Sequence, residues 1–250
     1  MRKFLAYPKN SLLLGLLVAL AACTPPGSQA VRVEERKTAA GTVYSLFHPQ
    51  GLAIRVLTNR PNVGDATYQL SVAAAYTDLG NDQPLDLLVY QGQLRQPKAT
   101  VGFLDGVLTS LGDSLTITQI VGGQAPPSAE LARARSQHGT VLLQELLVFQ
   151  GRNLKHGAGN VFQRRALVEF ANQHFAVVES MADDLSMAQF GADLVELGAT
   201  NALYLDMGDW DEGWYKAGSQ VVKLGNRRTQ TARQSNWLVF ARPAPTAEPR

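Results

Sequence analysis

Short segments in which apolar and polar residues alternate recur along most of this chain, and they constrain its fold more than any other feature. Alternation with a period of two places apolar side chains on one face of a β-strand. Glycines follow several of these segments, as turns with positive φ require. The pattern predicts strands at Val31–Arg36, Thr42–Phe47, Leu52–Leu57, Tyr68–Ala75, Leu85–Tyr90 and Leu115–Val121.

Three further stretches extend the strand pattern into the second half of the chain. The long apolar run Val141–Phe149 is typical of a central strand buried on both faces. Ala166–Phe170 and Phe175–Val178 flank Asn172-Gln173, which predicts a hairpin.

Two segments have the features of helices instead. Ser128–Arg135 follows two prolines and is rich in Ala, Leu and Arg. Ser186 and Gln189 form a capping-box pattern at the start of a second helix, and Gly198 is placed to end it. An apolar strand, Asn201–Asp206, follows and finishes on a carboxylate. We therefore predict an α+β fold, a single domain of mixed or antiparallel β-sheet with two or more packed helices.

The N-terminus has the pattern of a secretory signal, with three basic residues before a short apolar run, Leu12–Ala22. The run is about half the length that a bilayer-spanning helix needs. It ends in Leu20-Ala21-Ala22-Cys23, which resembles the bacterial lipobox and implies cleavage after residue 22 and a lipid anchor on Cys23. Thr24 in place of an aspartate resembles the outer-membrane sorting pattern of diderm bacteria, facing the periplasm or the surface. An ordinary signal peptide with a coincidental cysteine is the alternative.

The rest of the chain divides into three parts. Residues 23–30 form a lipidated cysteine and a polar tether, residues 31–241 the predicted domain, and residues 242–250 a Pro-rich tail expected to be disordered. Cys23 is the only cysteine, so an internal disulfide is excluded. Without the three basic residues of the signal, 20 Lys and Arg face 21 Asp and Glu. Nucleic-acid binding requires concentrated positive charge, so that class is excluded.

The densest polar and aromatic segment is Asn201–Lys216, with four acids, two tryptophans and two tyrosines. Aromatic faces beside carboxylates suit sugar recognition, because sugar C–H faces stack on rings while carboxylates bind hydroxyls. Asp206, Asp209 and Asp211 also offer oxygen ligands for a hard cation such as calcium, although they lack the spacing of an EF-hand loop. A solvated acidic turn over packed aromatics is the alternative.

Three stretches, "GNVFQRRALVEF", "NALYLDMGDWDEGWYKAG" and "SNWLVFA", resemble the phosphodiester glycosidase family. The resemblance implies hydrolysis of a sugar-1-phosphodiester linkage in an envelope glycan or glycoconjugate. By position, Asp206 matches the family aspartate at a strand end, and Arg164 matches the family arginine, followed by Arg165. Asn236 matches an asparagine before the final strand. An arginine fork suits the two oxygens of a phosphodiester.

The chain also departs from the family pattern. The early Asn-Gly-Gly-x-Phe-like stretch of the family is Ala73–Asp78 in this chain, so Tyr76 or Asp78 would stand in for the missing asparagine. Met207 replaces one of two paired glycines, which narrows the room for a ligand.

Two hypotheses about function follow. As an enzyme, the chain would pair Asp206 with Asp209 or Asp78, since glycoside cleavage commonly uses two carboxylates. As the alternative, it would be a catalytically inactive glycan-binding lipoprotein of the same fold. For the enzyme we expect the guanidinium of Arg164 to face the Asp206 carboxylate. The candidate substrate-binding residues are Arg164, Arg165, Tyr76, His156, Trp210, Trp214, Tyr215 and Asn236.

Overall fold

The computed structural model describes residues 30–207, 212–226 and 229–243. The signal and Cys23 lie outside this part, so the lipid anchor stays a prediction. Within the described ranges, no helix combines the length and the apolar character needed to cross a membrane.

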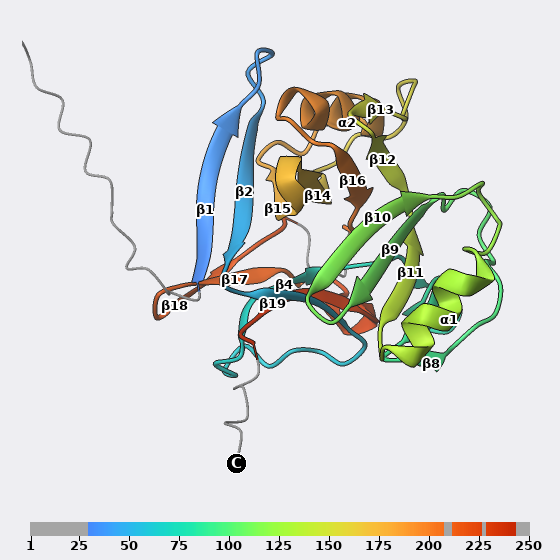
Figure 1. Ribbon diagram of the computed structural model, residues 1–250. Helices are drawn as coiled ribbons and strands as arrows, with labels where there is room; N and C mark the ends of the chain where they lie inside the picture. Colours follow the sequence, from blue (N-terminus) through green and yellow to red (C-terminus); the bar gives the residue numbers. More distant parts are fainter. Residues whose placement is uncertain (1–29, 208–211, 227–228, 244–250) are drawn as a thin grey trace, which may run out of the picture.

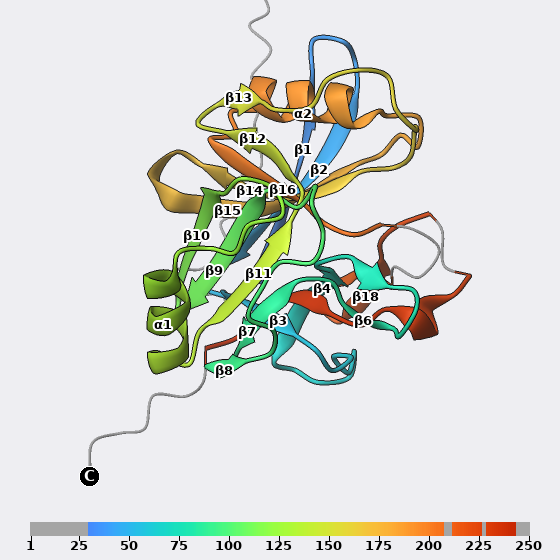
Figure 2. The ribbon, with the colours of Figure 1, turned by 90° about the vertical axis from the view of Figure 1, so that its right-hand side faces the viewer.

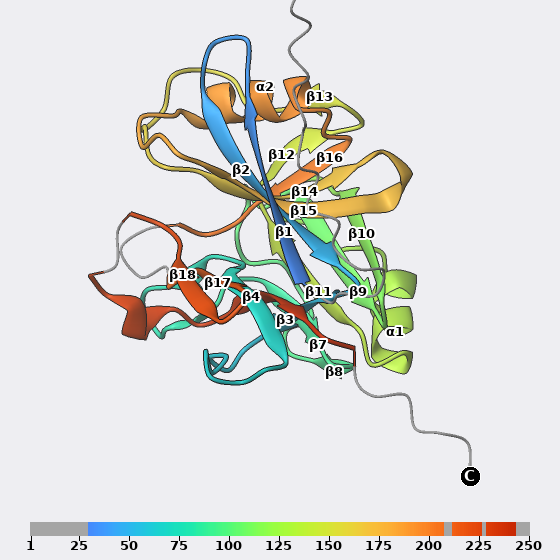
Figure 3. The same cartoon turned by 90° about the vertical axis from the view of Figure 1, so that its left-hand side faces the viewer.

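The largest sheet has seven strands in the order β1-β2-β15-β14-β16-β12-β13, and its pairings are antiparallel (Figure 1). Its strands are β1 (Ala30–Lys37), β2 (Val43–Gln50), β12 (Leu146–Phe149), β13 (Arg152–Asn153), β14 (Arg165–Phe170), β15 (His174–Ser180) and β16 (Asn201–Tyr204). The β1–β2 hairpin forms one edge of this sheet, and Figure 3 shows it from that side.

Two five-stranded sheets and a short ribbon contain the other described strands. One sheet has the order β10-β9-β11-β7-β8 and the other β18-β17-β4-β19-β3, while β5 pairs with β6. These strands are β3 (Ala53–Leu57), β4 (Tyr68–Ala73), β5 (Thr77–Asp78), β6 (Gln83–Pro84), β7 (Leu87–Tyr90), β8 (Gln93–Leu94), β9 (Gly106–Leu111), β10 (Ser114–Gln119), β11 (Thr140–Gln144), β17 (Trp214–Ala217), β18 (Gln220–Lys223) and β19 (Trp237–Ala241).

The three larger sheets enclose one apolar core. Leu167 comes from the seven-stranded sheet, Leu142 from the sheet of β11 and Leu70 from the sheet of β4, and all three belong to one buried cluster. The outer face of the seven-stranded sheet packs under helix α2 (Met187–Glu196), and helix α1 (Ser128–Ser136) lies against β7, β9 and β11 (Figure 2). The helices therefore cover outer faces and leave the central core to the sheets.

This arrangement corrects the predicted fold class. Of the described residues, 44% are in strands and 12% in helices, so the fold is predominantly β and the α+β assignment is wrong. Each helix covers one sheet face only, because the strands already bury their inner faces against one another. Several strands that the sequence pattern did not predict, among them β9, shift the balance further toward β.

The apolar run Val141–Phe149 is two strands instead of one. It divides at Glu145 into β11 and β12, which belong to different sheets. Gln144 and Glu145 interrupt the run, but the residues on either side are equally apolar and buried, so the pattern does not show that the two halves pair in different sheets. The predicted hairpin of β14 and β15 is confirmed, with positive φ at both Asn172 and Gln173.

Helix α2 begins as its sequence predicts. Ser186 is the N-cap, and its hydroxyl accepts the backbone N–H of Gln189 at 3.1 Å. The side chain of Gln189 donates to Asp193 instead of closing the reciprocal half of a capping box. Gly198, at φ 97°, follows the helix and allows the chain to turn away.

Removing this cap should lower the stability of the fold by a small, measurable amount. We expect Ser186→Ala to lower the free energy of unfolding by about 1 kcal/mol, because the N–H of Gln189 loses its acceptor. Ser128→Ala is the matched control, since α1 starts after Pro127 without a side-chain cap and should change stability by less than about 0.5 kcal/mol. Urea unfolding measures both, and equal losses in the two variants would contradict the assignment.

Candidate functional site

The pairing of β14 with β16 places Arg164 opposite Asp206. Ala166 pairs with Tyr204, and the N–H of Leu205 donates to the carbonyl of Arg165 at 3.0 Å, so the ladder continues past the end of β16. Residues two apart on a strand share a face. Arg164, Tyr204 and Asp206 therefore lie at one end of two adjacent strands, on the face that α2 covers further along.

The guanidinium of Arg164 is buried and has several partners. Its Nε donates to the carbonyl of Leu185 at 3.0 Å and its Nη2 to that of Asn160 at 2.5 Å. Its Nη1 lies 3.5 Å from the hydroxyl of Tyr204, and Cζ lies 5.8 Å from the centroid of the same ring. Arg164 is thus a buried cation that lies over the ring of Tyr204, and two of its nitrogens, Nε and Nη2, donate to backbone carbonyls.

Asp206 is 2% exposed, and its N–H donates to the carbonyl of Ala74 at 2.9 Å. Its charge acts on two neighbouring tyrosines. Burial raises the pKa of Tyr204 to about 12, with Arg164 lowering it and Asp206 raising it. Burial also raises the pKa of Tyr76, helped by Tyr204, Glu145 and Asp206. The two rings lie 5.8 Å apart, so the tyrosines, Arg164 and Asp206 form one group, called the Asp206 cluster below.

Asn236 fixes the segment that precedes Tyr76. Its Oδ1 accepts the N–H of Ala75 at 2.6 Å, and its Nδ2 donates to the carbonyl of the same residue at 3.0 Å. The buried side chain therefore takes the place of a strand partner just before β19. Asn236 positions the backbone of residues 74–76, which in turn accepts the N–H of Asp206.

A second carboxylate joins this cluster from a residue that sequence reasoning missed. Oε2 of Glu145 accepts the hydroxyl of Tyr76 at 3.0 Å, and Oε1 lies 2.8 Å from Nζ of Lys155. The N–H of Tyr204 donates to the carbonyl of Glu145 at 2.9 Å. A single carboxylate inside the apolar run Val141–Phe149 was the available signal, because an acid in such a run is rarely buried without a partner.

Arg165 lies on the opposite face of the sheet from Arg164. It is fully buried, and its Nε donates to Glu179 at 2.6 Å, with Nη2 also in contact with that carboxylate. Gln163 and the N–H of Gly225 donate to the other oxygen of Glu179. The structure places the two arginines on opposite faces of the sheet, and Arg164 lies on the face of Asp206.

The remaining described candidates lie apart from the Asp206 cluster or face elsewhere. The carboxylate of Asp78 accepts from Gly80 and Asn81 in its own turn. His156 is exposed on the loop after Lys155. Tyr215 packs against Phe47 in the central core.

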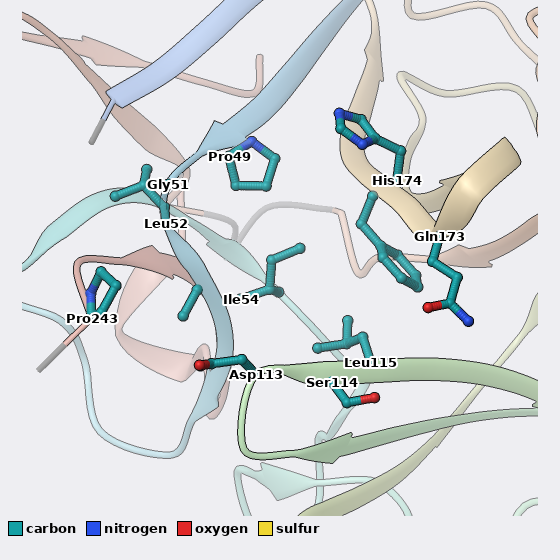
Figure 4. A pocket seen from close by; sticks show the side chains of 12 residues that line it. Pro49, Gly51, Leu52, Ile54, Asp113, Ser114, Leu115, Gln173, His174 and Pro243 are labelled. Carbon is teal, nitrogen blue, oxygen red and sulfur yellow. The ribbon is translucent and has the colours of Figure 1, made fainter. Parts of the chain in front are cut away.

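Trp214 is buried and lies beside the ammonium of Lys216, 5.7 Å from the ring centroid. It lines a cavity of about 690 Å³ together with Arg60, Glu212 and Lys223. A second cavity, about 390 Å³, opens where β3, β10 and the start of β15 meet (Figure 4). Neither cavity is lined by Arg164 or Asp206.

Asp209, Trp210 and Asp211 lie outside the described residues, as does Cys23. Within residues 30–207, 212–226 and 229–243, no three His, Cys, Asp or Glu side chains gather as metal ligands would. Since two of the three candidate ligands fall outside those ranges, calcium stays a prediction.

No family model matches this chain, and no curated protein matches its sequence. The solved catalytic domain of zebrafish N-acetylglucosamine-1-phosphodiester alpha-N-acetylglucosaminidase, auto-inhibited by its pro-peptide, aligns with 89% of this chain and 85% of its own, at TM-score 0.58 and 11% identity. This chain shares the fold of that glycosidase domain.

At 11% identity the likeness shows the fold alone. The resemblance to phosphodiester glycosidases that the sequence indicates is thus confirmed at the level of the fold. A hypothetical protein from Synechocystis aligns with 85% of this chain and 62% of its own, at TM-score 0.49 and 15% identity.

Proposed function

We propose that this protein is a phosphodiester glycosidase-like hydrolase that cleaves a sugar-1-phosphodiester linkage in an envelope glycan or glycoconjugate. One observation carries the proposal: Arg164 and Asp206 lie opposite each other at the end of adjacent strands, on the same sheet face, with Tyr204 beside both. A cation and a carboxylate in this arrangement are what a glycosyl phosphate needs. The cation binds the phosphate, and the carboxylate binds or activates groups around the anomeric carbon.

Each residue then has a role in the proposed reaction. The donors of Arg164 that do not bind the backbone would bind phosphate oxygens. Asp206 would hold a sugar hydroxyl or act in acid–base catalysis, with Asn236 keeping the adjacent backbone in place. We also propose that Cys23 anchors the protein in the envelope, on the strength of the Leu20–Cys23 motif.

A second candidate is a catalytically inactive, glycan-binding protein of the same fold. It is favoured by the contacts of Arg164, whose Nε and Nη2 already donate to backbone carbonyls. An arginine committed in this way stabilises the protein and has fewer donors left for a phosphate.

The proposal is tested with the purified full-length protein and a GlcNAc-1-phosphodiester, assayed with and without calcium for released sugar. We expect release by the wild type and a loss of about 100-fold or more in Asp206→Asn. Glu169→Gln is the control, because Glu169 binds Asn201 at the other end of β14 and β16.

Two outcomes count against parts of this proposal. Wild-type turnover by Asp206→Asn would remove Asp206 from the reaction. Binding of the phosphodiester by the wild type without any release of sugar would leave the glycan-binding candidate in its place.

A further inference from the structure

Glu145 occupies a special position, at the point where the chain passes from one sheet to another. It follows β11 and precedes β12, between two buried neighbours. The adjacent Gln144 donates to the carbonyl of Ala74, the same carbonyl that accepts the N–H of Asp206. The crossing therefore brings Glu145 beside Tyr204, two residues before Asp206.

The register of the sheet places Glu145 on the same face as the Asp206 cluster. Leu146 pairs with Leu203 and faces the central core, so Glu145 and Tyr204 face the other way. The contact of Glu145 with the hydroxyl of Tyr76 agrees with this, since the ring of Tyr76 lies against that of Tyr204. The ends of three adjacent strands, β14, β16 and β12, thus carry Arg164, Asp206 and Glu145.

The carboxylate of Glu145 is more accessible to solvent than that of Asp206. The side chain of Glu145 is 19% exposed, whereas Asp206 is 2% exposed. Lys155 and Tyr76 hold the two oxygens of Glu145 from two sides, at 2.8 Å and 3.0 Å. A carboxylate that is fixed in position and still reached by water is suited to receive a proton from that water.

The chemistry of a glycosyl phosphate needs such a base more than it needs an acid. The leaving group is a phosphate monoester, whose second pKa is about 6, so it can depart at neutral pH without being protonated. A nearby cation is enough to stabilise its charge, and Arg164 supplies one. The step that remains is removal of a proton from the attacking water.

We propose that Glu145 is the general base of the reaction, with Lys155 and Tyr76 as its positioning residues; this rests on the proposed function. The oxygen of water attacks the anomeric carbon while the bond from that carbon to the phosphate oxygen breaks. The bonding electrons leave with the phosphate monoester. The water proton passes to Glu145, and the products are the free sugar and the phosphate monoester.

The test compares Glu145→Gln and Glu145→Ala with the wild type in the GlcNAc-1-phosphodiester assay. We expect each to lose about 100-fold to 10,000-fold in kcat, with little change in KM. Glu169→Gln, a change at a half-buried carboxylate on β14, should keep the wild-type rate. Thermal unfolding of each variant separates loss of the base from loss of the fold.

Rescue of turnover by azide distinguishes a general base from a residue that only supports the structure. Azide is an anionic nucleophile and needs no base, so it should restore turnover of Glu145→Ala and yield a glycosyl azide, detected by mass spectrometry. Turnover by Glu145→Gln at the wild-type rate would overturn the role of Glu145 and leave the proposed function standing. A lack of azide rescue in a folded, sugar-binding Glu145→Ala would also overturn it. Failure of the wild type to release sugar would instead refute the proposed function itself.

Discussion

Glu179→Gln is expected to destabilise this protein by about 3–5 kcal/mol, a large part of the margin that keeps a domain folded. Arg165 is fully buried, and Glu179 is its counter-charge at 2.6 Å from Nε. The amide of glutamine would leave the guanidinium buried without this negative partner. The carboxylate also accepts hydrogen bonds from Gln163 and from the N–H of Gly225. Replacement of this carboxylate would therefore also weaken the attachment of the segment around Gly225 to β15.

Replacing both charged residues tests whether the unpaired charge of Arg165 causes the loss of stability. Arg165→Met with Glu179→Leu removes both charges together and should recover most of the lost stability, because a buried ion pair stabilises little relative to apolar side chains of similar size. Glu169→Gln, on the same hairpin but half-buried, should change stability by less than about 1 kcal/mol. Urea unfolding at neutral pH measures all three. A double variant as unstable as Glu179→Gln would contradict the account.

The separation of Arg164 from Arg165 shows where sequence reasoning stops. Two adjacent residues on a strand must face opposite sides of the sheet, so one arginine of the pair had to enter the core. The pattern of residues does not say which one. The decision depends on Glu179, 14 residues away, which lies opposite Arg165 in the register of β14 and β15.

Local signals were reliable where the partners were local. The Ser186 cap of α2 and the β14–β15 turn depend on residues within a few positions, and both form, although the reciprocal half of the predicted capping box does not. The sheet to which a strand belongs depends on distant residues. In the run Val141–Phe149, the acid at Glu145 was a local signal of a buried partner, but neither that partner nor the change of sheet could be predicted from nearby residues.

Stability is expected to fall steeply with alkaline pH, because three largely buried tyrosines resist ionisation in the folded protein. Burial raises the pKa of Tyr44, whose hydroxyl donates to Asp193 at 2.5 Å, and burial likewise raises the pKa of Tyr76 and Tyr204. In the unfolded chain all three titrate at about pH 10. Below that pH both states keep their phenolic protons and the stability is complete.

Above about pH 10 the unfolded state loses these protons first, so the free energy of unfolding decreases. Each tyrosine contributes up to about 1.4 kcal/mol per pH unit, and for Tyr204 the loss continues to about pH 12, its folded pKa. The three together remove up to about 4 kcal/mol per pH unit, so two units remove up to about 8 kcal/mol, which is enough to unfold many domains of ordinary stability.

Urea unfolding across this range, followed together with tyrosinate absorbance, measures the slope against pH. The Tyr204→Phe variant should lose about a third of it, since phenylalanine keeps the ring and has no proton to lose. A triple phenylalanine variant at positions 44, 76 and 204 should lose most of the tyrosine contribution, although it also removes the hydroxyls that donate to Asp193 and Glu145. An equal slope in the wild type and the triple variant would show that these rings ionise as readily in the folded protein as in the unfolded chain.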